Sequence, residues 1–247
     1  MDLGKTVFQS VALGAIEPFG WLDSQLRLQA DGLSSHLDEF WPDIRDSSWI
    51  GGDAEGWERV PYWLDCAIPL AWLLDHGDLK SRTACYMDHI IDHQQGDGWL
   101  RPLVEEKALR RQARHIDNDP LWEWGQFRWF EALIAIWWQH ERIRKQWLLD
   151  LAVTLQSQGF HWKSFFARWP LTVPTPKGRW DFPGHVVNNA MALKGDALWW
   201  RLSGEPGDRT AAHRMIETLE EHHEAVTGVF MGDECLAGGS PVQGTEL

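Results

Sequence analysis

Apolar residues along most of the chain recur every three to four positions, the spacing that places them on one face of an α-helix. This spacing predicts helices at about 21–40, 56–75, 79–94, 121–140, 143–157, 184–202 and 208–225. The clearest row lies in the second of these and comprises Val60, Leu64, Ala67, Ala71 and Leu74. An extended piece is expected at 7–13. The pattern therefore predicts an all-α fold.

Two of the predicted helices carry specific expectations about burial. The helix at 21–40 should be interrupted near Gly32 and should end at Trp41, because a residue before a proline avoids the helical region. Its candidate core positions are Trp21, Leu22, Leu26, Leu28, Leu33, Leu37 and Phe40. The helix at 121–140 is apolar almost all round, so we expect it to be buried on more than one side.

Three of the predicted helices close with similar segments, which begin at Trp72, Trp137 and Trp199. Their spacing equals about one helix pair with its connections, and repeated helix pairs stack linearly or close into a ring. We therefore predict a partial (α/α)6 toroid of helical hairpins, with residues 1–247 forming one domain. The chain supplies only about half of the six pairs, so we expect a truncated ring whose exposed helix faces favour self-association.

The charge balance excludes some classes of binding partner. The net charge is −13, from 36 acidic and 23 basic residues, which argues against a nucleic-acid or anionic-membrane surface. The sequence has no apolar run of about twenty residues and no signal-peptide pattern at its start, so we expect a cytoplasmic protein without a membrane partner. Three widely separated cysteines fit a reducing compartment.

Tryptophan is unusually abundant, at 18 residues against two tyrosines. Tryptophan buries a large area and also offers a flat face, so these residues either fill a helical core or line a cleft that stacks against sugar rings. A neutral carbohydrate substrate fits an acidic chain. Cleavage of a glycoside usually needs two carboxylates. The candidate carboxylates are Asp53, Glu58, Asp65, Asp233, Glu234 and Glu246.

Three blocks, in chain order, resemble the β-L-arabinofuranosidase-type glycoside hydrolases. They are 58–65 (Glu-Arg-Val-Pro-Tyr-Trp-Leu-Asp), 184–194 (Gly-His-Val-Val-Asn-Asn-Ala-Met-Ala-Leu-Lys), and 233–238 (Asp-Glu-Cys-Leu-Ala-Gly) followed by 243–246 (Gln-Gly-Thr-Glu). The resemblance implies the N-terminal part of an (α/α)6 catalytic barrel that acts on β-L-arabinofuranosides or related plant-glycan sugars with retention. That family uses a cysteine nucleophile held on zinc, a glutamate that binds the metal and a glutamate that serves as acid/base.

The matched positions suggest a role for each candidate residue. Glu234 resembles the acid/base, with Asp233 beside it near the sugar. Glu246 resembles the catalytic glutamate that binds the metal, and His185 resembles a histidine that contacts substrate. The resemblance further implies a cleft lined by Asn188, Trp57 and Trp63.

The chain departs from the family pattern after Glu246. The metal-binding cysteines of the family follow this glutamate, whereas the present sequence stops at Leu247. A catalytic zinc usually takes three protein ligands, so Glu246 alone cannot hold it, and the spacing gives no reason to add Cys235. We expect that this chain alone binds no zinc and that it is a fragment, and whether it is an enzyme stays open.

Two other readings remain. The first is a metal-independent sugar hydrolase or epimerase on an (α/α) barrel, with Asp53 or Asp65 close to Glu234. The second is a non-catalytic fragment that binds carbohydrate, which would follow from the missing nucleophile and the incomplete ring.

Overall fold

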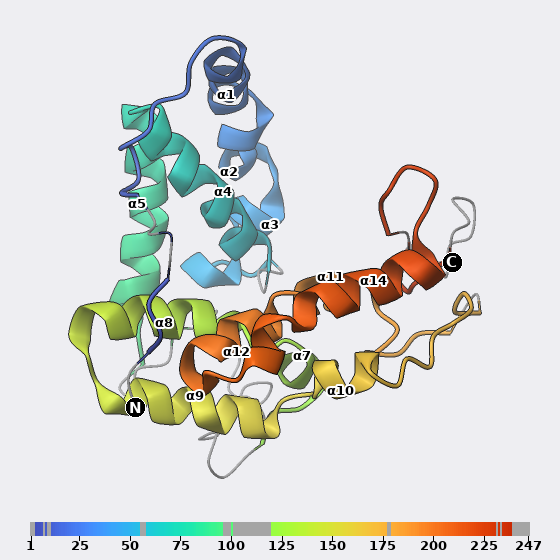
Figure 1. Ribbon diagram of the computed structural model, residues 1–247. Helices are drawn as coiled ribbons and strands as arrows, with labels where there is room; N and C mark the ends of the chain where they lie inside the picture. Colours follow the sequence, from blue (N-terminus) through green and yellow to red (C-terminus); the bar gives the residue numbers. More distant parts are fainter. Residues whose placement is uncertain are drawn as a thin grey trace. The chain divides into compact units, whose positions relative to one another are not determined.

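The computed structural model describes residues 3–6, 8, 11–54, 58–95, 100, 120–176, 179–230, 232 and 234–238. Within these ranges the chain is helical and its β pairing is limited to isolated bridges, which confirms the all-α prediction (Figure 1). No helix in the described part is long and apolar enough to cross a membrane. The toroidal arrangement stays a prediction.

The chain divides into two compact units, where the sequence analysis treated residues 1–247 as one domain. One unit is Phe8–Arg114, and the other combines Met1–Val7 with His115–Leu247. Each unit has its own cluster of buried apolar side chains. The two are therefore described separately below as the Phe8–Arg114 unit and the C-terminal unit.

The Phe8–Arg114 unit is centred on the hairpin of α4 (Arg59–Leu73) and α5 (Gly77–Asp92), which pack against each other (Figure 1). The predicted row of apolar residues forms the buried face of α4, and the helix continues through Pro69. Tyr86 ties α5 to the preceding segment, because its hydroxyl donates to the backbone oxygen of Ile44 at 3.1 Å. The shorter elements are α1 (Trp21–Asp31), η1 (Leu33–Ser35), α2 (Leu37–Phe40), α3 (Pro42–Arg45) and η2 (Ser48–Ile50).

The burial expected for residues 21–40 is wrong for most of the row. Gly32 ends α1 in an extended conformation, and η1 and α2 follow, so the apolar positions do not share one continuous helical face. Ala30 is the buried residue of α1. Leu26 and Leu37 are partly buried against the core. The exposed members of the row are Trp21, Leu22, Leu28, Leu33 and Phe40.

The C-terminal unit contains eight described helices. They are α7 (Glu123–Phe127), α8 (Glu131–Ile143), α9 (Gln146–Gln158), α10 (Trp162–Phe166), α11 (Val186–Ala192), α12 (Gly195–Ser203), α13 (Pro206–Arg209) and α14 (Ala211–His223). The hairpin of α8 and α9 packs against α12 through α8, and α14 packs against α10, α12 and α13. Their shared core includes Phe130, Trp137, Leu149 and Met215. The predicted helix at 184–202 divides into α11 and α12. Gly195 at the start of α12 lies against the buried ring of Phe130, where a Cβ atom would come within 3.0 Å of Cδ1.

The all-round burial expected for 121–140 is also wrong. The segment breaks between α7 and α8, and α8 then buries one face with Leu133, Ile136 and Trp137. Its opposite face leaves Ile134 and Trp138 about half exposed, at 49% and 55%. An apolar residue on a helix is therefore no guarantee of burial in this chain. The three similar tryptophan segments are not equivalent either, since Trp72 is exposed while Trp137 is buried.

Candidate functional site

Backbone hydrogen bonds hold residues 234–236 against the start of α11. The N–H of Val186 donates to the carbonyl oxygen of Glu234 at 2.8 Å, and the N–H of Leu236 donates to that of Gly184 at 3.0 Å. An antiparallel bridge accordingly joins His185 to Cys235. Two sequence blocks that lie almost fifty residues apart therefore meet in the C-terminal unit.

His185 caps α11 and contacts the Glu234 side chain at the same time. Its Nδ1 atom accepts the backbone N–H of Asn188 at 3.2 Å, so the proton of the neutral ring lies on Nε2. The Nε2–H group then donates to Oε2 of Glu234 at 2.9 Å. Helix capping thus selects the histidine tautomer that points an N–H donor at the carboxylate.

The environment of His185 favours its neutral form. Burial in the protein lowers the pKa of the imidazole below its ordinary value, and the positive charge of Arg128 acts in the same direction. The negative charge of Glu234 and its hydrogen bond oppose this shift without cancelling it. His185 therefore acts near neutral pH as a fixed hydrogen-bond donor to Glu234 and not as its cationic partner.

Aromatic side chains surround this carboxylate. The indole N–H of Trp180 donates to Oε2 of Glu234 at 3.4 Å, and the Trp124 ring lies edge-to-face with those of His185 and Trp180, at 5.2 and 5.4 Å between centroids. Phe182 packs against both tryptophans at 5.0 and 4.7 Å. The Glu234 side chain is 45% exposed, and Trp124 and Trp180 are 41% and 43% exposed. A carboxylate and two indole rings are thus accessible on one surface.

A buried amide supports the aromatic surface from behind. Arg128 donates through Nε to Oδ1 of Asn188 at 2.7 Å, and its guanidinium carbon lies 4.4 Å from the ring centroid of Trp124. Asn188 in turn donates to the carbonyl oxygen of Phe182 at 3.0 Å. Asn188 has no exposed surface, and its expected contact with substrate stays a prediction. It holds Arg128, which stacks on Trp124.

The further described candidates Trp63, Asp53 and Asp65 belong to the Phe8–Arg114 unit. Trp63 is a core residue of the Phe8–Arg114 unit with 4% exposure, because α4 turns it inward, and its indole N–H donates to Ser34 O at 2.9 Å. It is therefore not placed to stack against a sugar. Asp53 is exposed in a loop, and Asp65 borders an apolar groove between α4 and α5. Trp57, Asp233 and Glu246 lie outside the described residues.

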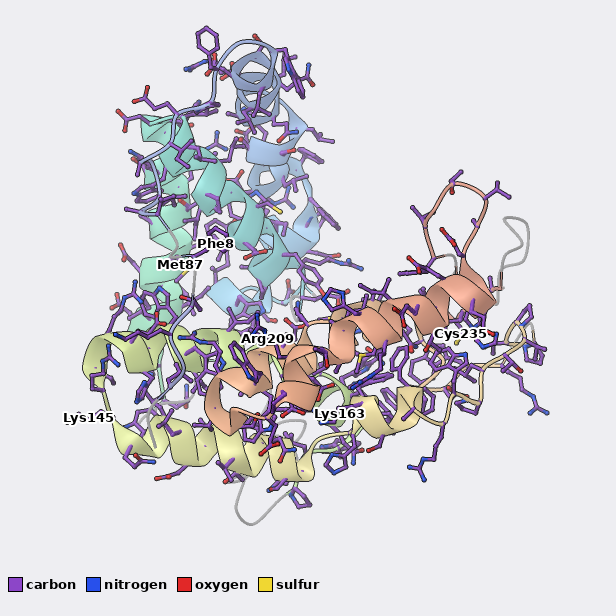
Figure 2. All side chains as sticks on the ribbon, in the orientation of Figure 1. Phe8, Met87, Lys145, Lys163, Arg209 and Cys235 are labelled. Atoms are coloured by element: carbon purple, nitrogen blue, oxygen red, sulfur yellow. The ribbon has the colours of Figure 1, made fainter. Side chains whose placement is uncertain are left out.

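The described residues do not form a zinc site. No three of their His, Cys, Asp and Glu side chains come close enough together to hold a metal ion. Cys235, labelled in Figure 2, has no exposed surface and pairs through its backbone with His185. A catalytic zinc needs at least three protein ligands and an open position.

Sequence reasoning missed most of the aromatic surface. Trp124 and Arg128 are four residues apart, a spacing that places two side chains on one helical face, and this was a usable signal. Trp180 and Phe182 precede the block that begins at Gly184, outside any helical pattern. Their part in the site depends on the return of residues 234–236 to this place.

The resulting arrangement, called here the Glu234 centre, consists of Glu234, His185, Trp180, Trp124 and Phe182. Its carboxylate is accessible, is oriented by two N–H donors and lies beside flat apolar rings. Such a group is suited to exchange a proton with a bound neutral molecule whose apolar face lies on the rings. Comparisons of the chain with models of protein families, with curated proteins and with solved structures return no match.

Proposed function

We propose that the Glu234 centre acts on carbohydrate, with Glu234 as the acid/base of a glycoside hydrolase of the β-L-arabinofuranosidase type. The observation that carries the proposal is the half-exposed Glu234 carboxylate, which is hydrogen-bonded by His185 and Trp180 among accessible indole rings. The resemblance of residues 184–194 and 233–238 to that family supplies the substrate class, β-L-arabinofuranosides or related plant-glycan sugars.

The proposal gives each side chain of the centre a separate task. A sugar ring lies on Trp124 and Trp180, whose flat faces match its C–H surface. Glu234 gives a proton to the leaving glycosidic oxygen and later takes one from water. His185 and Trp180 keep the carboxylate turned toward the sugar through their N–H groups. The described residues supply no nucleophile for the sugar carbon. In the family that the sequence resembles, this role belongs to a cysteine that follows the glutamate matched by Glu246.

A second candidate function is carbohydrate binding without turnover. The same aromatic surface favours this function. It carries Glu234, and no second described carboxylate is hydrogen-bonded to Glu234. Glycoside cleavage needs two catalytic groups. The metal-independent reading requires Asp53 or Asp65 near Glu234. Both belong to the Phe8–Arg114 unit, whereas Glu234 belongs to the C-terminal unit.

Hydrolysis of aryl glycosides by Glu234→Gln tests the proposal. Glutamine keeps the size of the side chain and can still accept from His185, but it cannot exchange a proton with the substrate. With p-nitrophenyl β-L-arabinofuranoside, and related pentosides beside it, we expect the substitution to lower kcat by about 10²- to 10⁴-fold. The matched control is Asp150→Asn, which removes an exposed carboxylate on α9 that accepts from Gln146.

Each result of this assay has one meaning. Loss of turnover in Glu234→Gln but not in Asp150→Asn supports the hydrolase. Equal turnover in both variants would remove Glu234 from the reaction and overturn the proposal. Saturable binding of arabinose-containing oligosaccharides without any turnover would instead support the second candidate.

Self-association belongs to the same proposal. Large apolar side chains are exposed on and after α1, among them Trp21 at 77%, Leu28 at 66% and Leu33 at 69%. Exposed apolar side chains that gather on one surface often mark a contact with another molecule. We propose that copies of the chain associate through this face. Light scattering after size exclusion should show a larger species that Leu28→Glu reduces to monomer.

A further inference from the structure

A second polar and aromatic cavity lies within the C-terminal unit, formed by residues from α9, α10, α12 and α13 and by the segment before α8. It encloses about 190 Å³. A cavity of this size suits a compact ligand. None of its lining residues belongs to the Glu234 centre.

One wall of the cavity is aromatic. Trp129, Phe160, Trp162 and Trp199 contribute side chains to it. The indole N–H of Trp129 donates to Phe160 O at 3.2 Å, and that of Trp162 donates to Phe127 O at 2.9 Å. Since both donors are occupied by backbone oxygens, these two indoles present carbon and π surface to a ligand.

The lining also carries charged side chains, and most of their charge is already paired. Lys163 (labelled in Figure 2) forms an ion pair with Oδ1 of Asp208, and the hydroxyl of Ser203 donates to Oδ2 of the same carboxylate at 2.7 Å. Both oxygens of Asp208 are thus occupied. The single lysine of the lining is committed to Asp208 and is not available to another anion.

The carboxyl group of Asp196 takes no part in this network. Asp196 lines the cavity, and among the described residues its side chain has no hydrogen-bond or ion-pair partner. Burial raises its pKa to about 6, nearby Asp208 acts in the same direction, and the charges of Lys163 and Arg214 oppose the shift. Above that pH the cavity holds an ionised carboxylate that has no hydrogen-bond or ion-pair partner among the described residues. Glu205 and His161, at the exposed rim, are the other titratable groups of the lining.

We propose that this cavity binds a small organic cation, with its ammonium group against Asp196 and its carbon skeleton against the tryptophan wall. A positive charge satisfies the carboxylate that the protein leaves without a partner. Indole rings attract cations through their π faces, most strongly in sites shielded from water. The lining itself carries Asp196, Asp208 and Glu205 against Lys163, which makes an anionic ligand unfavourable.

Choline and its uncharged carbon analogue, in which a quaternary carbon replaces the nitrogen, form a matched pair of probes. Titration calorimetry on the full chain should show choline binding at least about tenfold more tightly than the analogue at about pH 8. This preference should disappear at about pH 4.5, where Asp196 is protonated. It should also disappear in Asp196→Asn and persist in Asp150→Asn and Glu234→Gln.

The alternative results overturn the proposal. Equal binding of the two probes would mean that the cavity selects shape and not charge. A preference for choline that survives in Asp196→Asn would place the cation elsewhere. If choline does not bind to the unaltered chain, Asp196 does not bind a cation and the proposal is wrong. Because Glu234→Gln is expected to bind choline normally, the outcome is independent of the glycoside hydrolase proposal.

Discussion

Nε2 of His185 lies 2.9 Å from Oε2 of Glu234, although 48 residues separate the two in the chain. The contact rests on two backbone hydrogen bonds between their neighbours and on the capping bond that fixes the histidine ring. Its geometry is therefore determined by the start of α11 and not by the freedom of the glutamate side chain. The proposed chemistry depends on this fixed relationship.

Replacing Trp180 by phenylalanine should weaken catalysis without unfolding the chain. The substitution keeps an aromatic ring but removes the N–H that donates to Glu234. A typical hydrogen bond contributes about 1 kcal/mol, so kcat/KM for the p-nitrophenyl glycoside should fall by roughly fivefold. Trp122→Phe is the matched control, because Trp122 is likewise exposed. Equal losses in both variants would contradict the assigned role of the Trp180 N–H.

Acid should release the segment that carries Glu234 through protonation of His223. This buried ring donates from Nε2 to Leu171 O at 2.6 Å and accepts the N–H of Gly238 on Nδ1 at 3.1 Å. Burial lowers its pKa below the ordinary value, with a smaller contribution from His222. The neutral ring therefore stabilises the fold above the ordinary pKa, and this stability is lost as the pH falls through the folded-state pKa.

Hydrogen exchange measures that release directly. The protection factor of the Gly238 amide, which corrects for the intrinsic exchange rate at each pH, should be lower at about pH 5 than at about pH 7. His223→Gln, which cannot gain the charge, should lose the pH dependence. Protection that is unchanged by acid in the unaltered chain would contradict this account.

Gly159 should not tolerate a methyl group. A Cβ atom there would lie 2.1 Å from Cδ1 of Trp129, whose ring is 8% exposed and cannot move aside freely. Overpacking of this kind costs about 1–3 kcal/mol, so Gly159→Ala should lower the free energy of unfolding by that amount. Gly77→Ala is the matched control at the start of α5, where nothing lies within 4 Å. Urea denaturation measures the free energy of unfolding of both variants. If Gly159→Ala leaves this free energy unchanged, the packing described is contradicted.

Asp196→Asn should stabilise the chain in a pH-dependent way. The folded-state pKa of about 6 is raised above the ordinary value of 3.8, so the protonated carboxyl favours folding at low pH and this contribution is lost as the pH rises through about 6. At about pH 8 the asparagine variant should be more stable than the unaltered chain by roughly 2–3 kcal/mol, and at about pH 4 the two should be nearly equal. If the difference in free energy of unfolding between the two chains does not change with pH, the burial of the Asp196 carboxyl group is contradicted.

Helical periodicity predicted most of the helices and the buried face of α4, but it did not predict every buried face. It located α4, α5, α8, α9 and α14, because their apolar residues follow a helical period over several turns. Around Trp21 and Leu28 the same pattern failed, since a break at Gly32 decides which apolar positions face the core. Periodicity identifies a face only while the helix that carries it continues.

The candidate site was predictable only in part. The resemblance named His185 and Glu234 separately, and the structure brings the two together. Nothing in the local sequence marks Trp180 as a donor to Glu234, because that contact depends on the return of the chain 54 residues later. Trp63 illustrates a second limit of sequence reasoning. An aromatic residue in a matched block is equally suited to a core, and α4 directs Trp63 there.

The central claim is that sugar binds on the Trp180 ring beside Glu234, and the indole N–H signal of Trp180 reports on that place directly. In a nitrogen-15 correlation spectrum the signal is identified by its loss in Trp180→Phe. An arabinose-containing oligosaccharide should shift it saturably, and Glu234→Gln should change its position before any sugar is added. A titration that leaves the Trp180 signal in place, whether or not other tryptophan signals move, would contradict the proposed function.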